Sequence, residues 1–126
     1  MTEKPKKNNG IIRILYAFTY TFSGLHHAIM NEAAFRQEAV IFVITLIAIP
    51  FMPVIGIIKL LLILTSIIIL IVELLNCAIE AVVDKVSPEY NELAKQAKDM
   101  GSAAVFLSFT ASGAVWLYAI IQIFTV

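Results

Sequence analysis

The sequence predicts an all-α membrane protein in which one amphipathic interfacial helix precedes three transmembrane helices. Of the 126 residues, 60% are hydrophobic and only 14% are charged, and the mean hydropathy is +0.91. A soluble domain would have about 45–50% apolar and about 25% charged residues. A chain of this length usually forms one domain, so we expect residues 1–126 to be a single membrane-embedded unit.

The first expected helix covers about residues 10–30 and is amphipathic. Its apolar residues recur at steps of three and four and therefore share one face: Ile11, Ile14, Leu15, Phe18, Phe22, Leu25 and Ile29. Polar residues, including Arg13 and Tyr20, fall on the opposite face. A helix with this much polarity on one side lies in the membrane interface instead of crossing the bilayer. The interleaved pattern also differs from that of a cleaved signal peptide.

Spanning helices are expected at about residues 32–49, 57–83 and 101–124. The first has about 18 residues and reaches ~27 Å at ~1.5 Å per residue, which is enough to cross the hydrocarbon. Pro50 and Pro53 end it, because proline lacks the N–H group that a helix interior needs.

The connection after the second span is polar, and the third span is not. We expect Ser87 to be a helix N-cap and Pro88 the first helical residue, with the polar residues 89–99 leading into the span. The span itself carries no charge. Four of its residues are small or hydroxylated and are expected to allow close helix packing: Ser108, Thr110, Ser112 and Gly113.

Lysine and arginine predict the orientation. They cluster before the first span and between the second and third: Lys4, Lys6, Lys7, Arg13, Lys85, Lys95 and Lys98. The turn between the first two spans has only Lys59. The positive-inside rule therefore places the N-terminus and the second connection in the cytoplasm.

Glu73 is the most informative residue, because it interrupts a segment, residues 60–83, that is otherwise apolar enough to cross a membrane. A carboxylate at that depth costs roughly 2.5–3.5 kcal/mol on the mildest scale, so it is a candidate functional residue. Asn76, Glu80 and Asp84 follow at steps of three or four and form one stripe with Glu73 on the helix.

Further polar groups open the first and third spans and converge on the same cytoplasmic level: Glu32, Arg36, Glu38, Lys95, Lys98, Asp99 and Ser102. Some have simpler explanations. Glu32 and Arg36 could form a helix-surface ion pair. Lys95 and Lys98 could contact anionic lipid. Asn76 and Ser102 could form interhelical hydrogen bonds.

Together these groups favour phosphoryl transfer at a membrane surface. Glu32 and Glu80 suit Mg²⁺, which takes one or two carboxylates along with phosphate oxygens. Lys98 and Arg13 suit phosphate charge. Glu73, partly removed from water, suits a general base.

Other classes of chemistry lack their motifs. The sequence has no Gly-x-x-x-x-Gly-Lys-Ser/Thr loop, no protein-kinase Gly-rich loop and no Gly-x-Ser-x-Gly elbow. Cys77 is the single cysteine, which excludes an internal disulfide and a Cys-based metal cage. The net charge of +0 gives no indication of a nucleic-acid partner.

Three strings carry a family resemblance: NEAAFRQE at residues 31–38, VELLNCAIEAVVD at 72–84 and AKDMGSAAV at 97–105. They resemble bacterial integral-membrane diacylglycerol kinase, in order and over nearly the whole chain. The resemblance implies ATP-dependent phosphorylation of diacylglycerol to phosphatidic acid in the bacterial inner membrane, feeding phospholipid synthesis. It also implies a homotrimer with active sites shared between subunits.

The resemblance assigns roles to individual residues. Glu73 would be the general base and Asn76 would orient the site, while Glu32 and Glu80 would hold Mg²⁺. Nucleotide contacts would come from Arg13, Tyr20, Glu32, Glu80, Glu89, Tyr90, Asn91, Lys98 and Asp99. The lipid substrate would be contacted by Asn31, Ala33, Ala34, Phe35, Glu38, Lys59, Glu73 and Ser102. Lys59 stands where better-known members have arginine.

Two alternatives stay open. An undecaprenol kinase of the same family would use the same groups on a polyisoprenoid alcohol. A small oligomeric proton-coupled transporter would use Glu73 to load and release protons. The transporter predicts polar groups spread through the depth of the bilayer, whereas the charged residues gather at one level.

Overall fold

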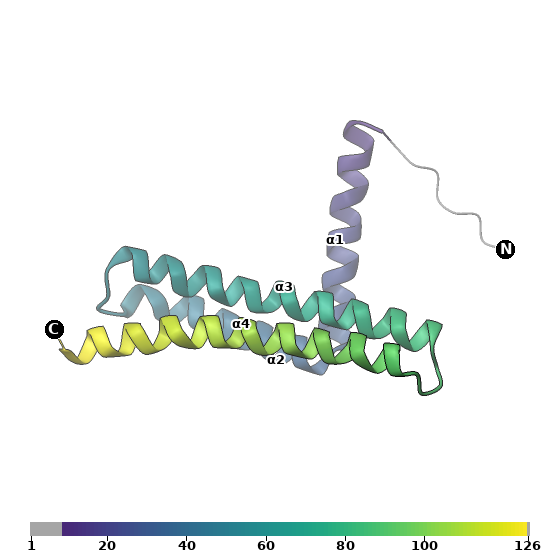
Figure 1. Ribbon diagram of the computed structural model, residues 1–126. Coiled ribbons are helices and arrows are strands. Elements are labelled where there is room, and N and C mark those ends of the chain that lie inside the picture. Colours follow the sequence, from purple (N-terminus) through teal and green to yellow (C-terminus); the bar gives the residue numbers. More distant parts are fainter. Residues whose placement is uncertain (1–8, 126) are drawn as a thin grey trace.

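The computed structural model describes residues 9–125, and their regular structure is entirely helical (Figure 1). The elements in chain order are α1 (Ile11–Asn31), α2 (Ala33–Ala48), the short 3₁₀ helix η1 (Ile49–Phe51), α3 (Gly56–Val86) and α4 (Glu92–Thr125). Lys4, Lys6 and Lys7, which contribute to the predicted orientation, lie outside the described residues.

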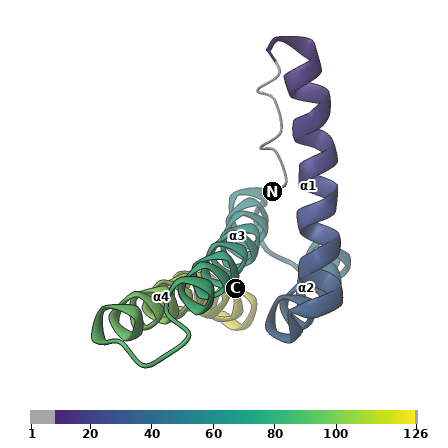
Figure 2. The same cartoon turned by 90° about the vertical axis from the view of Figure 1, so that its right-hand side faces the viewer.

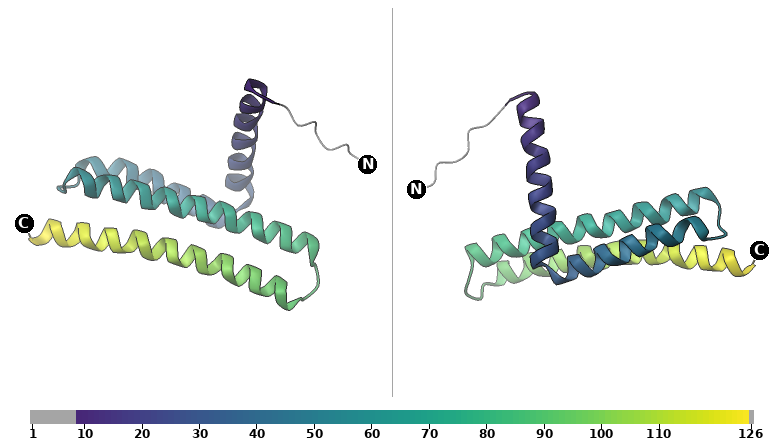
Figure 3. Two further views of the ribbon diagram at one scale, coloured as in Figure 1. Left: turned by 45° about the horizontal axis from the view of Figure 1, so that its top comes forward. Right: turned by 180° about the vertical axis from the view of Figure 1, so that it is seen from behind.

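Helices α2, α3 and α4 lie side by side as an elongated bundle, and α1 projects steeply away from it (Figures 1 and 3). Viewed end-on, α3 lies between α2 and α4 (Figure 2). The most extensive packing is between α3 and α4. We call the end formed by the connection between α3 and α4, residues 84–99, the charged end, and the end at η1 the apolar end.

Three of the helices are long and apolar enough to cross a membrane, as predicted: Ala33–Phe51 including η1, Gly56–Val86 and Glu92–Thr125. With 31 and 34 residues, α3 and α4 exceed a hydrocarbon thickness of ~30 Å at ~1.5 Å per residue. Both helices therefore extend beyond the hydrocarbon. Because charged residues gather at the charged end, the extra length lies at that end.

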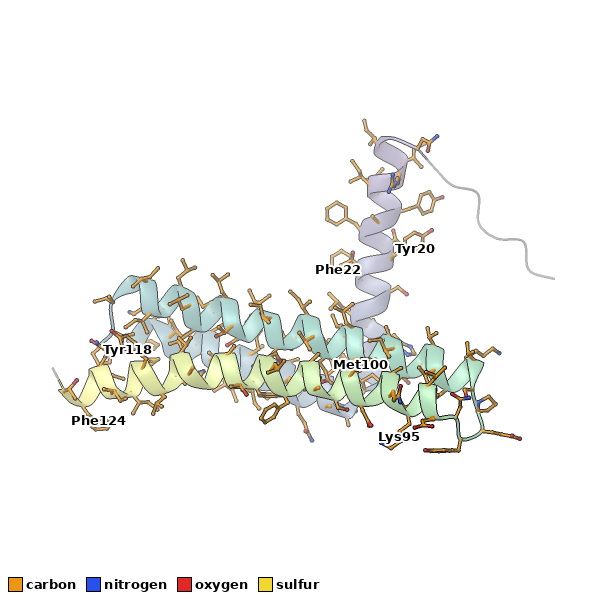
Figure 4. The ribbon with its side chains drawn as sticks, in the orientation of Figure 1. Tyr20, Phe22, Lys95, Met100, Tyr118 and Phe124 are labelled. Atoms are coloured by element: carbon orange, nitrogen blue, oxygen red, sulfur yellow. The ribbon has the colours of Figure 1, made fainter. Side chains whose placement is uncertain are left out.

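The amphipathic pattern predicted for the first helix is visible on α1. Figure 4 shows Tyr20 and Phe22 pointing to opposite sides of this helix. The break between α1 and α2 lies at Glu32, whose extended backbone (φ −108°, ψ 105°) interrupts the helical course. The N–H group of Glu32 still donates to the carbonyl oxygen of Ala28 at 2.9 Å, so α1 is capped as the chain turns. Glu32 is therefore both a candidate site residue and the point where α1 leaves the bundle.

The prediction for Ser87 and Pro88 was wrong. Ser87 is the C-cap of α3, with its N–H group donating to the carbonyl oxygen of Val83 at 2.8 Å, and Pro88 is not helical. The N-terminus of α4 is capped by Asn91 instead. Its Oδ1 accepts hydrogen bonds from the N–H groups of Leu93 and Ala94, at 2.9 and 3.2 Å. An Asn side chain satisfies these otherwise free donors, so α4 begins at Glu92, well before the expected span.

The turn between α2 and α3 follows the sequence prediction. Helix α2 ends at Ala48, and η1 contains Pro50. Lys59, near the start of α3, donates from Nζ to the carbonyl oxygen of Pro50 at 3.3 Å. This bond ties the two sides of the turn together at the apolar end.

A small apolar core fixes the same end. It consists of Ile49, Ile58, Leu62 and Ala119, all nearly inaccessible. The many apolar side chains left exposed on the outside of the bundle suit contact with lipid, which solvates them as water would not. Packing inside the bundle therefore depends on few side chains.

Substituting Leu62 tests this core. Leu62 is the one large side chain among the described residues that is completely buried, so Leu62→Ala should lower the free energy of unfolding by about 2–5 kcal/mol through the cavity that it leaves. Unfolding in mixed micelles with denaturing detergent measures the change. Leu60→Ala, on the exposed side of the same helix, is the control and should have a much smaller effect. Equal losses would show that Leu62 has no special packing role.

Candidate functional site

Two polar side chains are buried in the second half of α3. Glu73 is 5% exposed and Asn76 is 9% exposed, although neither is an apolar residue. They lie three positions apart and so share one face of the helix. A buried acid and a buried amide on a membrane-embedded helix mark this face as the centre of the candidate site.

Other carboxyl groups surround Glu73. Glu80 and Glu32 lie near enough to repel its charged form, and Glu38 is near enough to be repelled by Glu73. The Cys77 thiol, one turn along α3, donates a hydrogen bond from Sγ to Oε1 of Glu73 at 3.7 Å. α1, α2 and α3 therefore meet at a strongly acidic place, which a cation would stabilise.

A cavity of about 400 Å³ opens beside this acidic place, between α1 and α3. Its lining includes Tyr20 and His27 from α1, Glu32 from the break, and Cys77 from α3. The fold thus brings Tyr20 and Glu32, two of the predicted nucleotide residues, into one cavity next to Glu73.

A second hollow, also of about 400 Å³, lies at the charged end. Five predicted nucleotide residues line it: Glu89, Tyr90, Asn91, Lys98 and Asp99. They come from the connection between α3 and α4 and from the first turns of α4, where Asn91 also caps the helix. The family resemblance had grouped these residues, and the structure brings them together.

Ion pairs hold the two lysines of this hollow. Lys98 Nζ lies 2.5 Å from Oδ1 of Asp84 and links α4 to α3, while Lys95 Nζ lies 2.6 Å from Oδ2 of Asp99 within α4. Both pairs are largely exposed to solvent. Lys98 is therefore oriented toward the end of the acidic stripe without being buried.

Glu38 borders a third cavity, of about 220 Å³, inside the bundle. Hydroxyl-bearing residues Thr45, Ser66 and Ser112 share its lining. Within residues 9–125, the buried Oε2 of Glu38 has no hydrogen-bond partner. Glu38 thus offers a buried oxygen atom that could accept a hydrogen bond from a ligand.

Several predicted site residues lie apart from these cavities. Arg13 is in the first turn of α1, the end that projects away from the bundle (Figure 1). Lys59 lies near the apolar end. Within one chain, neither reaches the neighbourhood of Glu73, and their ligand contacts stay predictions.

The remaining lipid candidates lie around the break between α1 and α2 and at the start of the α4 span. Ala33, Ala34 and Ser102 are exposed, whereas Phe35 is buried and packs inside the bundle. The Asn31 amide donates from Nδ2 to the carbonyl oxygen of His27 at 2.9 Å. Asn31, Ala33, Ala34 and Phe35 are close in sequence to Glu32, whereas Ser102 lies on α4.

No functional role was predicted from the sequence for Cys77 or Gly101. Cys77 lies four residues after Glu73, and this spacing could have placed the two side chains on the same face of α3. Gly101 is buried and faces Asn76 across α3 and α4. Nothing in the sequence reveals that contact, because it depends on how the two helices are aligned.

A metal ion at this site would need ligands from outside the chain, such as phosphate oxygens or water, in addition to protein side chains. Residues 9–125 contain no group of three or more His, Cys, Asp and Glu side chains arranged to hold one. Mg²⁺ needs fewer, since it commonly takes one or two carboxylates with phosphate oxygens and water. Glu32 and Glu80, both near Glu73, fit that smaller requirement.

Fold and site together define a small α-helical membrane protein with a buried acidic centre and a hollow lined by acids and lysines at one end of its bundle. A family model described as prokaryotic diacylglycerol kinase matches residues 19–120. The chain belongs to the prokaryotic diacylglycerol kinase family, which confirms the resemblance found in the sequence.

Several curated relatives are similar over most of their length. The diacylglycerol kinase of Escherichia coli (strain K12) is 45% identical over 107 residues, which cover 85% of this chain and 88% of the relative. That of Pseudomonas aeruginosa is 43% identical over 111 residues, covering 88% and 90%. That of Haemophilus influenzae is 36% identical over 110 residues, covering 87% and 93%.

Exposure of the Lys98–Asp84 pair leads to a prediction about stability. Asp84→Asn should leave the midpoint of unfolding in detergent at the wild-type value, because exposed ion pairs contribute little. Asp99→Asn, which breaks the pair within α4, is the comparison and should behave in the same way. A clear drop for Asp84→Asn alone would show that the pair holds α3 and α4 together.

Proposed function

We propose that the protein is an ATP-dependent lipid kinase that phosphorylates diacylglycerol to phosphatidic acid. Glu73 carries the proposal: a carboxyl group 5% exposed, on a membrane-embedded helix, in a chain of this family. The names of the relatives support diacylglycerol as the substrate. The product would feed phospholipid synthesis.

In the proposed reaction, Glu73 accepts the proton of the primary hydroxyl group of diacylglycerol. The hydroxyl oxygen forms a bond to the γ-phosphorus of ATP as the bond from that phosphorus to the β–γ bridging oxygen breaks. The electron pair of the broken bond leaves with ADP. Because Glu73 is buried, water would be excluded from the reacting groups. This would favour transfer of the phosphoryl group to the lipid over hydrolysis of ATP.

The hollow at the charged end would take the nucleotide. Lys98 offers an ammonium group to the phosphates, and Asp99, Glu89, Tyr90 and Asn91 line the same hollow. Tyr20 would approach from the cavity beside α1. Glu32 and Glu80 would hold Mg²⁺, which when bound neutralises charge on the phosphate oxygens.

The lipid would reach Glu73 from the bilayer side. Glu38, with its buried free oxygen, and Ser102 at the start of the α4 span are the polar groups proposed to contact it. The remaining members of the predicted lipid set are Asn31, Ala33, Ala34, Phe35 and Lys59.

Arg13 supports a shared site. Its helix projects away from the bundle, so within one chain it does not reach the hollow that contains Lys98. The family resemblance implies a homotrimer, and we propose that its neighbouring subunits complete each other's sites. ATP is cytoplasmic, so the charged end would face the cytoplasm in the bacterial inner membrane, as the distribution of lysine and arginine predicts.

The first test is transfer of labelled phosphate from ATP to diacylglycerol and, separately, to undecaprenol, in mixed micelles with Mg²⁺. Wild type should label diacylglycerol faster. Glu73→Gln should lower turnover by about 10²–10⁴-fold, because it removes a general base. Glu92→Gln, on the exposed first turn of α4, is the matched control and should stay near wild type.

Each outcome of that assay distinguishes a function. Preference for undecaprenol would keep the mechanism and change the lipid. Near-wild-type turnover of folded Glu73→Gln would refute its role as base. Labelling of neither lipid by folded wild type, together with proton-driven uptake in vesicles without ATP, would indicate a transporter.

A separate titration tests the metal assignment. Glu32→Gln and Glu80→Gln should each raise the Mg²⁺ concentration needed for half-maximal activity, or abolish activity, because each removes one anionic ligand. Initial rates at increasing Mg²⁺ and fixed ATP measure this, again with Glu92→Gln as control. Wild-type Mg²⁺ dependence in both variants would rule out the assignment.

A further inference from the structure

Helices α3 and α4 approach closely where Asn76 faces Gly101. Gly101 is buried, and a Cβ atom added to it would overlap Oδ1 of Asn76 and lie 3.3 Å from Cγ of Asn76. Gly113, in the same helix about 18 Å further on at ~1.5 Å per residue, has nothing in the described part of the chain within 4 Å of such an atom. A side chain added at Gly101 would therefore displace the Asn76 amide, whereas one added at Gly113 would displace nothing in the described part of the chain.

The buried amide of Asn76 is held by shape more than by hydrogen bonding. Its Oδ1 is buried and has no hydrogen-bond partner among the residues that the structure describes. The ideal Cβ position lies against this oxygen, so a Cα hydrogen of Gly101 points at it. Such a Cα–H···O contact contributes about 0.5–1 kcal/mol, too little by itself to fix an amide. The surface of α4 at Gly101 is what defines where the oxygen can lie.

The orientation of the amide matters because of its neighbours. Asn76 lies three residues after Glu73 and four before Glu80, on the same face of α3. An amide is planar, so when Oδ1 faces Gly101 the N–H donors of Nδ2 point away from α4. A carboxylate or a phosphate oxygen could accept from them.

We propose that Gly101 is a positioning residue for phosphoryl transfer, which acts by keeping the Asn76 amide in place beside Glu73. The inference rests on the proposed kinase function. A methyl group at position 101 would either change the rotamer of Asn76 or separate α3 from α4. Both responses move the amide relative to the acidic stripe. Helix propensity would act in the opposite direction, because alanine favours a helix interior over glycine by about 1 kcal/mol.

The test compares Gly101→Ala with Gly113→Ala in the purified full-length protein, with labelled phosphate transfer to diacylglycerol as the readout. Gly101→Ala should lower kcat by about 10- to 100-fold, the effect expected of a misplaced group, while the KM for ATP stays near its wild-type value. Gly113→Ala should keep wild-type kcat, because its added methyl group meets open space. Wild-type kcat in Gly101→Ala would overturn the inference.

A double-mutant cycle separates positioning from general damage to packing. Asn76→Ala removes the amide and should itself lower kcat. Adding Gly101→Ala to that variant should then change kcat by no more than about 2-fold, because residues in contact are not additive and no amide remains to be displaced. Equal losses in both backgrounds would overturn the inference, since they would show that Gly101 acts independently of Asn76.

Three further outcomes are decisive. If Gly101→Ala fails to fold, the double variant decides. Activity equal to that of Asn76→Ala supports the inference, and failure of the double variant to fold overturns it. If wild type transfers phosphate to neither lipid, the proposed function fails. If wild type is active and Gly101→Ala is equally active, only the inference about Gly101 fails.

Discussion

Burial of Glu73 in a membrane-embedded helix is the constraint on which the rest of this structure depends. The side chain is 5% exposed, and an acid at such a depth is expensive by any estimate. The fold surrounds it with more acids, Glu32 and Glu80, instead of an arginine or lysine partner. Such an arrangement does not stabilise a bundle on its own, so the stability must come from elsewhere, and the acids suit the cation-dependent role proposed for them.

Close packing of α3 against α4 supplies much of that stability. The buried residues of α4 are all small: Gly101, Ser108, Ser112 and Ala119. Their spacings of seven, four and seven form a seam that stays on one side of the helix. Membrane helices associate through van der Waals packing of such small residues, because lipid provides no hydrophobic driving force between them. Gly101, one residue of this seam, is also the residue that faces Asn76.

Hydropathy and spacing predicted the helices and the acidic stripe, but local chemistry and helix alignment decided the rest. Ser108 and Ser112 are in the packing seam as expected, whereas Thr110 and Gly113 are exposed. The early start of α4 was missed because its first turns are polar and depend on the Asn91 cap. The contact of Asn76 with Gly101 depends on the register of α3 against α4, which a single sequence does not contain.

Charge balance explains why the acidic centre and the hollow at the charged end would belong to one site. Lys98 is paired with Asp84, so its charge is already partly compensated. Little positive charge then remains for the carboxyl groups around Glu73, and binding a bare polyphosphate beside them would be unfavourable. A nucleotide that carries a divalent cation would reverse this balance, because the cation would contact carboxylates and phosphates together. The carboxyl groups around Glu73 are costly to bury. In the proposed site the same groups would favour a nucleotide that carries a divalent cation over a bare one.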